Sequence, residues 1–380
     1  MTKNPTLSAL SLPDADALDV IVARYLDDWS ARERTVCSEG GQRLPAETVR
    51  ELRASGLLGA PVPRVLGGLG ADLLTTSRAV RSVAERAPST ALCLAMPLGN
   101  AANARLEEAD VPHASRDALA VGRAFIAERA TAGVILAVAN SEPGSCGDLA
   151  NTRTLARRDG DVVRLTGKKS FATLGADADF FLCAARHEDG ALDAFFVARD
   201  AAGVTVAEAW NALGLRATAS VGMTLEDAQA AATFLYPGAI DGVNARHWST
   251  LLLGSVFVGI GQGAVRAAAA CAPGESSFAR ATLAECVLTL DAAAGFLDSV
   301  AREDCLPAPA QYVERCRRAK TFAARTALEV STRCMMIAGG RAYRPEHDLA
   351  RALLDAAAGP SLRPTLPQAM DQLADALFAD

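Results

Sequence analysis

One glycine-rich run in this sequence has a spacing similar to that of phosphate-binding loops. It reads Gly259-Ile-Gly261-Gln-Gly263, and backbone N–H groups of such a loop at the start of a helix can hold a phosphate. The dinucleotide-binding fingerprint also needs a different spacing of its third glycine and a following strand that ends in an acidic residue. This sequence continues into a helical stretch instead. We therefore reject a Rossmann site and expect these small residues to let two helices pack closely.

The cysteines offer a second kind of chemistry. The chain has nine of them, no two are spaced as C-x-x-C, and several lie in apolar stretches. Disulfides and thiolate zinc sites are usually marked by even counts and fixed spacings. We expect reduced core thiols in a cytoplasmic protein and no metal site.

Composition changes twice along the chain, and these changes predict the elements that must position any site. Residues 1–131 show apolar residues at helical spacing, residues 132–238 contain short β-like runs, and helical spacing returns over 239–380. This order predicts an α+β protein with an N-terminal helical domain, a middle, mainly antiparallel β domain and a C-terminal helical bundle. The expected strands are Gly133–Val138, Asp161–Thr166, Phe180–Ala185, Ala194–Val197 and Val204–Val206.

Charge and hydropathy exclude several partners. With 38 Lys and Arg against 44 Asp and Glu, the chain lacks the basic excess of a nucleic-acid-binding protein. Trp248–Val265 carries no charge over eighteen residues, which is the lower length limit for a membrane span. Because this stretch stands alone and contains glycines and serines, we expect a buried helix and no membrane span. The first twenty residues lack the apolar core of a signal peptide, which favours a cytoplasmic location.

The most informative segment begins at Ser141. It reads Ser141-Glu-Pro-Gly-Ser-Cys-Gly-Asp148 and is followed by Gly167-Lys168-Lys169 and Phe171-Ala-Thr173. These residues resemble the T-E-P-x-x-G-S-D loop, the glycine–lysine turn and the aromatic-x-Thr triplet of the acyl-CoA dehydrogenase family. Further matches follow the family's order over residues 15–378, at Leu44–Gly70, Trp210–Thr218 and Gly339–Asp355.

The resemblance implies a flavin cofactor. A flavin ring needs an apolar or aromatic face and a few polar groups aimed at its heteroatoms. By carry-over from the family, Phe171 packs against the ring, Thr173 hydrogen-bonds near its N5 atom, and the Ser141 hydroxyl replaces that of the family threonine. The glycines near 339 approach the cofactor of a neighbouring subunit in a homotetramer or homodimer. The implied cofactor-binding residues are Ser141, Phe171, Ala172, Thr173, Gly339, Gly340 and Thr365.

The position of the catalytic base departs from the family. In the family, the α-proton of an acyl thioester is usually removed by the glutamate of a Y-E-G-T motif. This glutamate lies in a pocket that excludes water. The matching residues are Leu362-Arg363-Pro364-Thr365, and arginine cannot act as a base near neutral pH. The alternative position on an earlier helix, Arg246–Thr250, contains no carboxylate. His247 is the candidate base there, although a histidine beside a tryptophan is more often structural.

Two further departures concern binding. Gly147 stands where a family serine contacts the substrate, so this position is the predicted substrate contact. The R-x-x-F-G segment that helps to bind the cofactor's pyrophosphate in the family is replaced by Ala272–Ser277. Because charge-assisted hydrogen bonds are the stronger kind, loss of that arginine weakens binding of a dinucleotide. The cofactor is therefore FAD held by other groups, or FMN delivered reduced.

The resemblance implies α,β-dehydrogenation of an acyl thioester, carried on CoA or on a carrier protein, with hydride transfer to N5 of FAD and an electron-transfer partner. Flavin-dependent monooxygenases built on the same fold also lack the glutamate and share the Trp-x-x-Leu-Gly-x-Arg-Ala-Thr pattern. A reduced-flavin monooxygenase served by a flavin reductase is therefore the alternative. A non-catalytic flavin-binding or assembly paralogue is the second alternative, because fold alone does not decide function.

Overall fold

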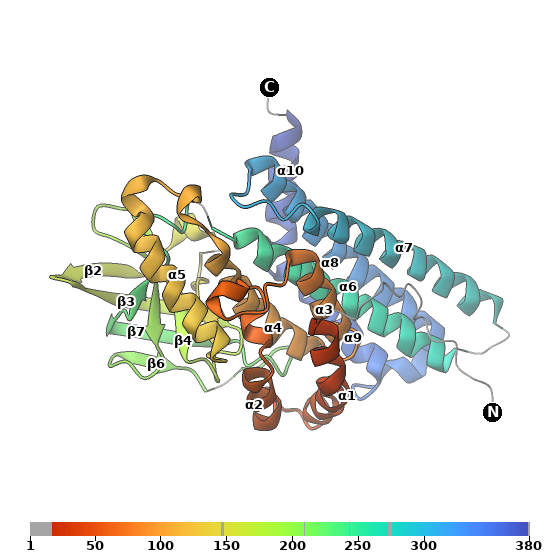
Figure 1. The fold of residues 1–380 in the computed structure, drawn as a ribbon. Helices are drawn as coiled ribbons and strands as arrows, with labels where there is room; N and C mark the ends of the chain where they lie inside the picture. The colour runs from red at the N-terminus through yellow and green to blue at the C-terminus, as the bar shows by residue number, and fades with distance from the viewer. Residues whose placement is uncertain (1–16, 146–147, 209, 243, 273–275, 379–380) are drawn as a thin grey trace.

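The computed structural model describes residues 17–378 except 146–147, 209, 243 and 273–275. A sheet lies at one end of the molecule, a bundle of long helices lies at the other, and the N-terminal helices pack beside both (Figure 1). The predicted α+β class, with strands between two helical regions, is confirmed.

The N-terminal helices are tied together by side chains of α1. Trp29, which is fully buried, donates from Nε1 to a carboxylate oxygen of Glu51 at 2.8 Å and so fastens α2 to α1. Glu33 accepts from the backbone N–H groups of Ser89 and Thr90, both at 2.8 Å, and thereby caps the start of α4. The helices are α1 (Ala17–Ser38), α2 (Ala46–Ala54), α3 (Leu73–Ala84), α4 (Pro88–Ala101) and α5 (Arg116–Thr131).

Within the described residues the sheet has eight strands, in the order β6-β7-β3-β2-β4-β5-β8 with β1 paired to β4. Most neighbours are antiparallel, whereas β4 is parallel to β1 and β2. Helix α5 lies across this domain (Figure 1), where the ring of Phe125 packs against Phe180 and Phe196 at centroid distances of 5.4 and 5.0 Å. The strands are β1 (Leu136–Val138), β2 (Leu155–Asp159), β3 (Val162–Ala172), β4 (Phe180–Arg186), β5 (Leu192–Ala198), β6 (Val204–Val206), β7 (Val221–Gln229) and β8 (Ala232–Thr233).

Strand β3 is longer than expected, and the predicted glycine–lysine turn is wrong. Gly167, Lys168 and Lys169 all lie within β3 and pair with β7. A Cβ atom on Gly167 would stand 2.4 Å from Oγ1 of Thr154. The glycine therefore permits a close approach of the Thr154 side chain and does not serve a turn.

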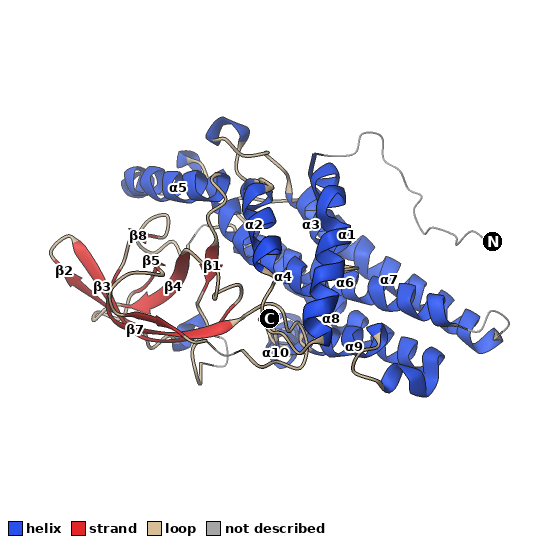
Figure 2. Ribbon diagram, turned by 90° about the horizontal axis from the view of Figure 1, so that it is seen from below, coloured by secondary structure: helices blue, strands red, loops and turns tan. Residues whose placement is uncertain are grey.

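The C-terminal bundle is built around α6. This helix is long and apolar enough to cross a membrane. However, 78% of its most apolar eighteen-residue stretch is buried inside the protein. In Figure 2 it lies among α3, α7, α8 and α9. The predicted buried helix is thus confirmed. The helices are α6 (Arg246–Cys271), α7 (Ser277–Ala301), α8 (Ala310–Ala338), α9 (Asp348–Ala357) and α10 (Leu366–Phe378).

The glycines of the Gly259–Gly263 run lie in the middle of α6, facing other helices. A Cβ atom on Gly259 would stand 2.4 Å from the carbonyl oxygen of Arg81, and one on Gly263 would stand 2.4 Å from that of Glu85. Close packing of α6 against α3 therefore requires both glycines, which confirms the packing interpretation of this motif.

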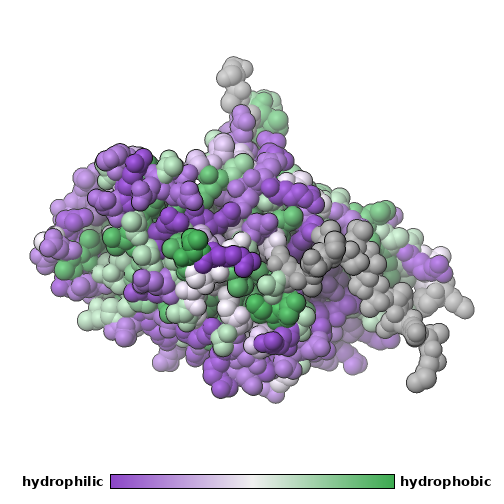
Figure 3. Space-filling model, viewed as in Figure 1, coloured by the Kyte–Doolittle hydropathy of each residue, from purple (hydrophilic) through white to green (hydrophobic). Residues whose placement is uncertain are grey.

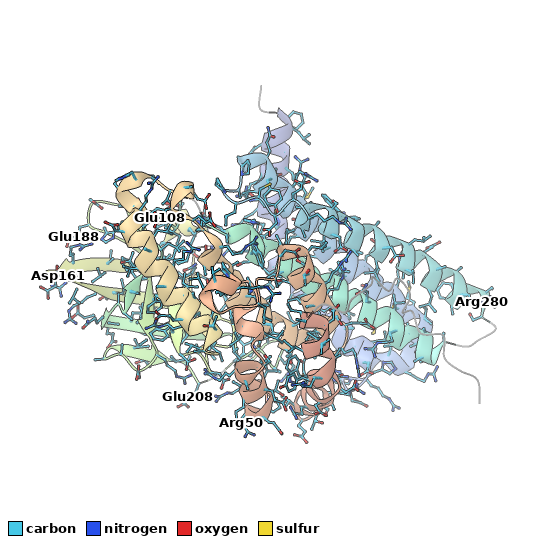
Figure 4. All side chains as sticks on the ribbon, viewed as in Figure 1. Arg50, Glu108, Asp161, Glu188, Glu208 and Arg280 are labelled. Atoms are coloured by element: carbon cyan, nitrogen blue, oxygen red, sulfur yellow. The ribbon has the colours of Figure 1, made fainter. Side chains whose placement is uncertain are left out.

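Charged side chains cover much of the surface and point outward in Figure 4, where several exposed examples are labelled. The face in Figure 3 shows polar and apolar residues interspersed. A large aromatic side chain that is exposed to solvent can indicate a binding site. Phe171 is one, with 63% of its surface exposed.

Candidate functional site

Phe171 stands at the end of β3 in a backbone conformation that bulky residues rarely adopt. Its φ is +59°, and the pairing of β3 with β7 shifts register between Lys169 and Ala172. Strain of this kind persists where the surrounding structure enforces it, most often at functional sites. The ring of Trp210 meets the Phe171 ring edge-on, with centroids 6.2 Å apart. Together the two side chains form an aromatic wall whose Phe171 side is open to solvent.

A chain of buried hydroxyl groups begins two residues after Phe171. The Ser220 hydroxyl donates to Oγ1 of Thr173 at 3.1 Å, and the Thr218 and Ser220 hydroxyls are 2.8 Å apart. The Leu174 N–H donates to the carbonyl oxygen of Thr218 at 2.8 Å, which ties the two segments together. The structure thus places the predicted Thr173 hydroxyl at the end of a hydrogen-bonded series next to the aromatic wall.

The loop that begins at Ser141 is anchored to β3 by a buried ion pair. Glu142 accepts from Nζ of Lys169 at 2.6 Å and from Oγ1 of Thr154 at 2.7 Å. Lys169 also donates to the carbonyl oxygen of Ala184 at 2.5 Å. Burial alone would raise the pKa of Glu142, but the hydrogen bonds from Lys169 and Thr154 outweigh it and hold that pKa below its ordinary value. Glu142 is thus a charged anchor of the loop.

Arg363 reaches this loop from the C-terminal bundle. Its Nη2 donates to Oγ of Ser141 at 3.3 Å, and the Ser141 carbonyl in turn accepts from the Ser170 N–H at 2.8 Å. Arg363 thus contacts the loop that pairs with β3 at Ser170, the residue directly before Phe171. Thr365 lies next to this segment, where its N–H donates to the Gln368 side chain at 3.1 Å at the start of α10.

The remaining predicted residues lie elsewhere or have other surroundings. Ala172 is the last residue of β3 and is fully buried. Gly339 follows the last residue of α8, and Gly340 lies in the short 3-10 turn after it, with open space beside each Cα. In the described part of the chain no hydrogen bond joins either to the Phe171 segment. Gly147 falls outside the described residues. The cofactor-binding and substrate-binding assignments therefore stay predictions.

His247, the candidate base, is enclosed. None of its side chain is exposed, its Nε2 is 3.6 Å from Oδ1 of Asp304, and its ring meets Tyr312 edge-on at 5.2 Å. Asp304 also accepts from Nε1 of Trp248 at 2.9 Å, so the histidine belongs to a packed cluster. Both of its ring nitrogens are buried with no hydrogen-bond partner among the described residues, and a role as base stays a prediction.

The sequence did not single out Trp210 or Ser220 as functional residues. The Nε1 atom of Trp210 is buried and has no hydrogen-bond partner among the described residues. An orphaned indole N–H is unusual, because buried donors are almost always paired. An exposed aromatic face, a hydroxyl chain and an unused donor together fit a planar heterocycle such as a flavin ring. The position of Trp210 within the Trp210–Thr218 motif was the sequence signal that could have identified it.

Asp355 on α9 positions the segment that carries Trp210. Its Oδ1 accepts from the Leu215 N–H at 2.5 Å. A Cβ atom on Gly214 would stand 2.0 Å from the carbonyl oxygen of Leu354, so this segment lies directly on α9. Asp355 also lines a cavity of about 220 Å³ between α1, α3, α6 and α9, which neither Phe171 nor Arg363 lines. Burial raises the pKa of Asp355 to about 7, and Glu33 contributes in the same direction.

Replacement of Asp355 with asparagine is expected to flatten the pH dependence of stability. The pKa of Asp355 is raised to about 7 in the folded state, so between about pH 4 and pH 7 the folded protein binds more protons than the unfolded chain. Stability from this group is complete near pH 4 and is lost as the pH rises to 7. Asparagine keeps an oxygen for the Leu215 N–H without a charge. Urea unfolding should find Asp355→Asn more stable than the wild type at pH 8 by about 1–3 kcal/mol, with little gain at pH 4.

The matched control is Asp348→Asn, which changes an exposed carboxylate at the start of the same helix. It should leave the pH profile close to that of the wild type. Parallel profiles for Asp355→Asn and the wild type would contradict the assignment.

Three domain descriptions match the chain. Residues 15–107 match the N-terminal domain of acyl-CoA dehydrogenases, residues 137–228 match the middle domain, and residues 251–361 match the C-terminal domain.

Relatives with different activities are similar over nearly the whole chain. Amino sugar nitrososynthase DnmZ of Streptomyces peucetius is 26% identical over 90% of this chain and 88% of its own length. Probable acyl-CoA dehydrogenase YngJ of Bacillus subtilis is 25% identical over 82% and 84%. Among solved structures, KijD3 in complex with FMN and dTDP-3-amino-2,3,6-trideoxy-4-keto-3-methyl-D-glucose has a TM-score of 0.82 and 26% identity, covering 96% of this chain and 95% of that one.

Proposed function

Since its three parts match the three domains of acyl-CoA dehydrogenases, the chain belongs to that family of flavin-dependent oxidoreductases, and we propose that it uses reduced flavin and oxygen to oxidise an amine. This proposal replaces desaturation of an acyl thioester, which the sequence resemblance favoured, with the alternative that the sequence left open.

The observation that carries the proposal is the arginine that stands at the position of the family's base and contacts the Ser141 loop. Desaturation needs a carboxylate in a dry pocket to remove a proton from carbon. Arg363 holds the matching position in this chain. Of the carboxylates in the Ser141 loop, Glu142 is bound to Lys169, and Asp148 is exposed and accepts from the Ala150 N–H at 2.9 Å. Neither meets the requirement for a general base.

A positive surrounding favours oxidation of an amine. The nitrogen must be neutral to act as a nucleophile, and nearby guanidinium groups lower the pKa of a bound ammonium group. Arg363, held at Ser141, supplies that charge. The nitrososynthases among the relatives support the same class of substrate.

The described residues would hold the flavin as follows. Phe171 would offer the ring an apolar face, and the Trp210 N–H and the Thr173 hydroxyl would be the polar groups for its heteroatoms. Bound reduced flavin would supply the electrons and activate oxygen. FMN suits this chain because the family segment for the cofactor's pyrophosphate is replaced by Ala272–Ser277.

The test compares two sets of conditions. Protein reconstituted with FMN is given NADH, a flavin reductase, isotopically labelled oxygen and a panel of amines that includes amino sugars linked to nucleoside diphosphates. We expect label in an oxidised amine and no bleaching of the flavin by acyl-CoAs under anaerobic conditions. Anaerobic bleaching by an acyl-CoA would make the protein a dehydrogenase, and a failure to take up flavin would make it a non-catalytic paralogue.

A further inference from the structure

We propose that the cavity between α1, α3, α6 and α9 binds a small zwitterion of the amino-acid type. The inference goes beyond the proposed function, since none of Phe171, Trp210 and Arg363 lines this cavity.

The cavity has the size and the wall of a site for a small organic molecule. Its volume is about 220 Å³, and a water molecule takes about 30 Å³ of liquid, so there is room for about seven waters. Ile260 and Pro88 line it together with alanines of α3, α6 and α9. A partly apolar wall suits a short carbon skeleton better than a bare ion.

Two carboxylates from different helices make one part of the wall acidic. Glu33 on α1 is 4% exposed, and each of its oxygens accepts from a backbone N–H at the start of α4. Asp355 on α9 accepts from the Leu215 N–H through Oδ1, and no donor among the described residues reaches its Oδ2. Because burial and the charge of Glu33 raise the pKa of Asp355, an ammonium group beside Asp355 would be stabilised.

Four arginines of the described chain line the same cavity, and Arg34 on α1 is the one without a carboxylate partner. Its side chain is exposed, and its Nη2 donates to Oγ of Ser30 at 3.5 Å. No Asp or Glu oxygen of the described residues lies within 4.0 Å of its guanidinium group. The guanidinium group can therefore bind the carboxylate of a ligand. The other three are paired as follows: Arg86 with Asp27, Arg266 with Glu85, and Arg351 with Asp348.

The balance of charge selects the ligand. Glu33 is compensated by the N–H groups at the start of α4, so Arg34 and Asp355 are the charges on the wall that lack an ionic partner among the described residues. An anion alone would meet the two carboxylates, and a cation alone would meet four arginines. A zwitterion offers a carboxylate to Arg34 and an ammonium group to Asp355, and so compensates both.

Asp355 connects this cavity to the aromatic wall. Its Oδ1 holds the Leu215 N–H of the segment that carries Trp210. An ammonium group bound to Asp355 favours the ionised carboxylate, which is a stronger hydrogen-bond acceptor than the neutral acid. We therefore expect an occupied cavity to hold the Trp210 segment more firmly and to tighten the binding of FMN.

The experiment compares amino acids with molecules that lack one of their charged groups. Calorimetry at pH 7 measures binding of L-alanine, ethylamine and propionate, and of L-valine, isobutylamine and isovalerate. We expect an amino acid to bind at least about tenfold more tightly than its amine and its acid, and about tenfold more weakly in Arg34→Gln and in Asp355→Asn. Asparagine keeps an acceptor for the Leu215 N–H, so this loss does not come from unfolding. Arg24→Gln, which changes an exposed arginine of α1 outside the cavity, is the control and should bind as the wild type does.

A second titration measures FMN affinity with and without a saturating amino acid, and we expect it to rise about fivefold or more. Unchanged FMN affinity would refute the connection through Asp355 and leave the site. Tighter binding of the amine or of the acid than of the amino acid would overturn the inference, as would no binding of either amino acid, or equal affinity in the wild type and both variants. These measurements need no turnover, so they stand or fall separately from amine oxidation.

Discussion

Lys169→Met is expected to lower the free energy of unfolding by about 3–5 kcal/mol, because it leaves the Glu142 carboxylate charged and buried without its cation. Both side chains of this pair are almost completely buried, at 0% and 4% exposed, and the Nζ–Oε1 distance is 2.6 Å. Methionine has a similar volume, so the loss is not one of packing. Urea denaturation followed by circular dichroism measures the change.

The same experiment also measures the double variant Glu142→Gln/Lys169→Met. Removal of both charges leaves an amide whose single oxygen can still accept from the Thr154 N–H, and part of the lost stability should return. If Lys169→Met lies within about 1 kcal/mol of the wild type, Glu142 is not held as an anion and our description of the loop anchor is incorrect.

Phe171→Ala is expected to weaken FMN binding by about tenfold to a hundredfold while folding stays nearly unchanged. Stacking on an aromatic face is worth about 1–3 kcal/mol for a nucleobase, and a flavin ring is at least as large. The side chain is 63% exposed, so alanine removes few buried contacts. Titration of the apoprotein with FMN, followed by fluorescence quenching, measures the affinity.

A matched control for this variant is Val121→Ala on α5, where the side chain is 71% exposed. It removes a similarly exposed apolar group away from the aromatic wall and should bind FMN as the wild type does. Equal FMN affinity in Phe171→Ala and the wild type would remove Phe171 from the flavin site.

Hydrophobic runs predicted part of the sheet and missed the rest for a physical reason. The apolar runs at β4, β5 and β6 were predicted because their residues are continuously hydrophobic or β-branched. Strand β7 reads Val-Gly-Met-Thr-Leu-Glu-Asp-Ala-Gln, and its buried positions are mixed with polar ones. Strand β2 contains Arg157 and Arg158 and is mostly exposed. Both strands form because pairing with β3 satisfies their backbone groups, which local composition does not report.

The candidate site shows the same limit. Ser141, Phe171 and Thr173 could be singled out because they lie in one short segment with a family pattern. The contact between Arg363 and Ser141 joins residues 222 positions apart, and no local spacing predicts it. The sequence identified Arg363 as the residue at the base position. Its contact with Ser141 required the fold.

The attachment of the Trp210 segment to α9 has a consequence for protein engineering. Gly214 admits no side chain against Leu354, and the Leu215 N–H is held by Asp355, so one wall of the site is shaped by a helix that follows it by more than a hundred residues. A chimera that takes only the sheet region from a relative would combine the relative's loop at the Trp210 position with the α9 of this chain, against which that loop does not pack in its own protein. A chimera that keeps the site intact therefore has to exchange α9 together with the sheet. The two act as one structural unit although they are far apart along the chain.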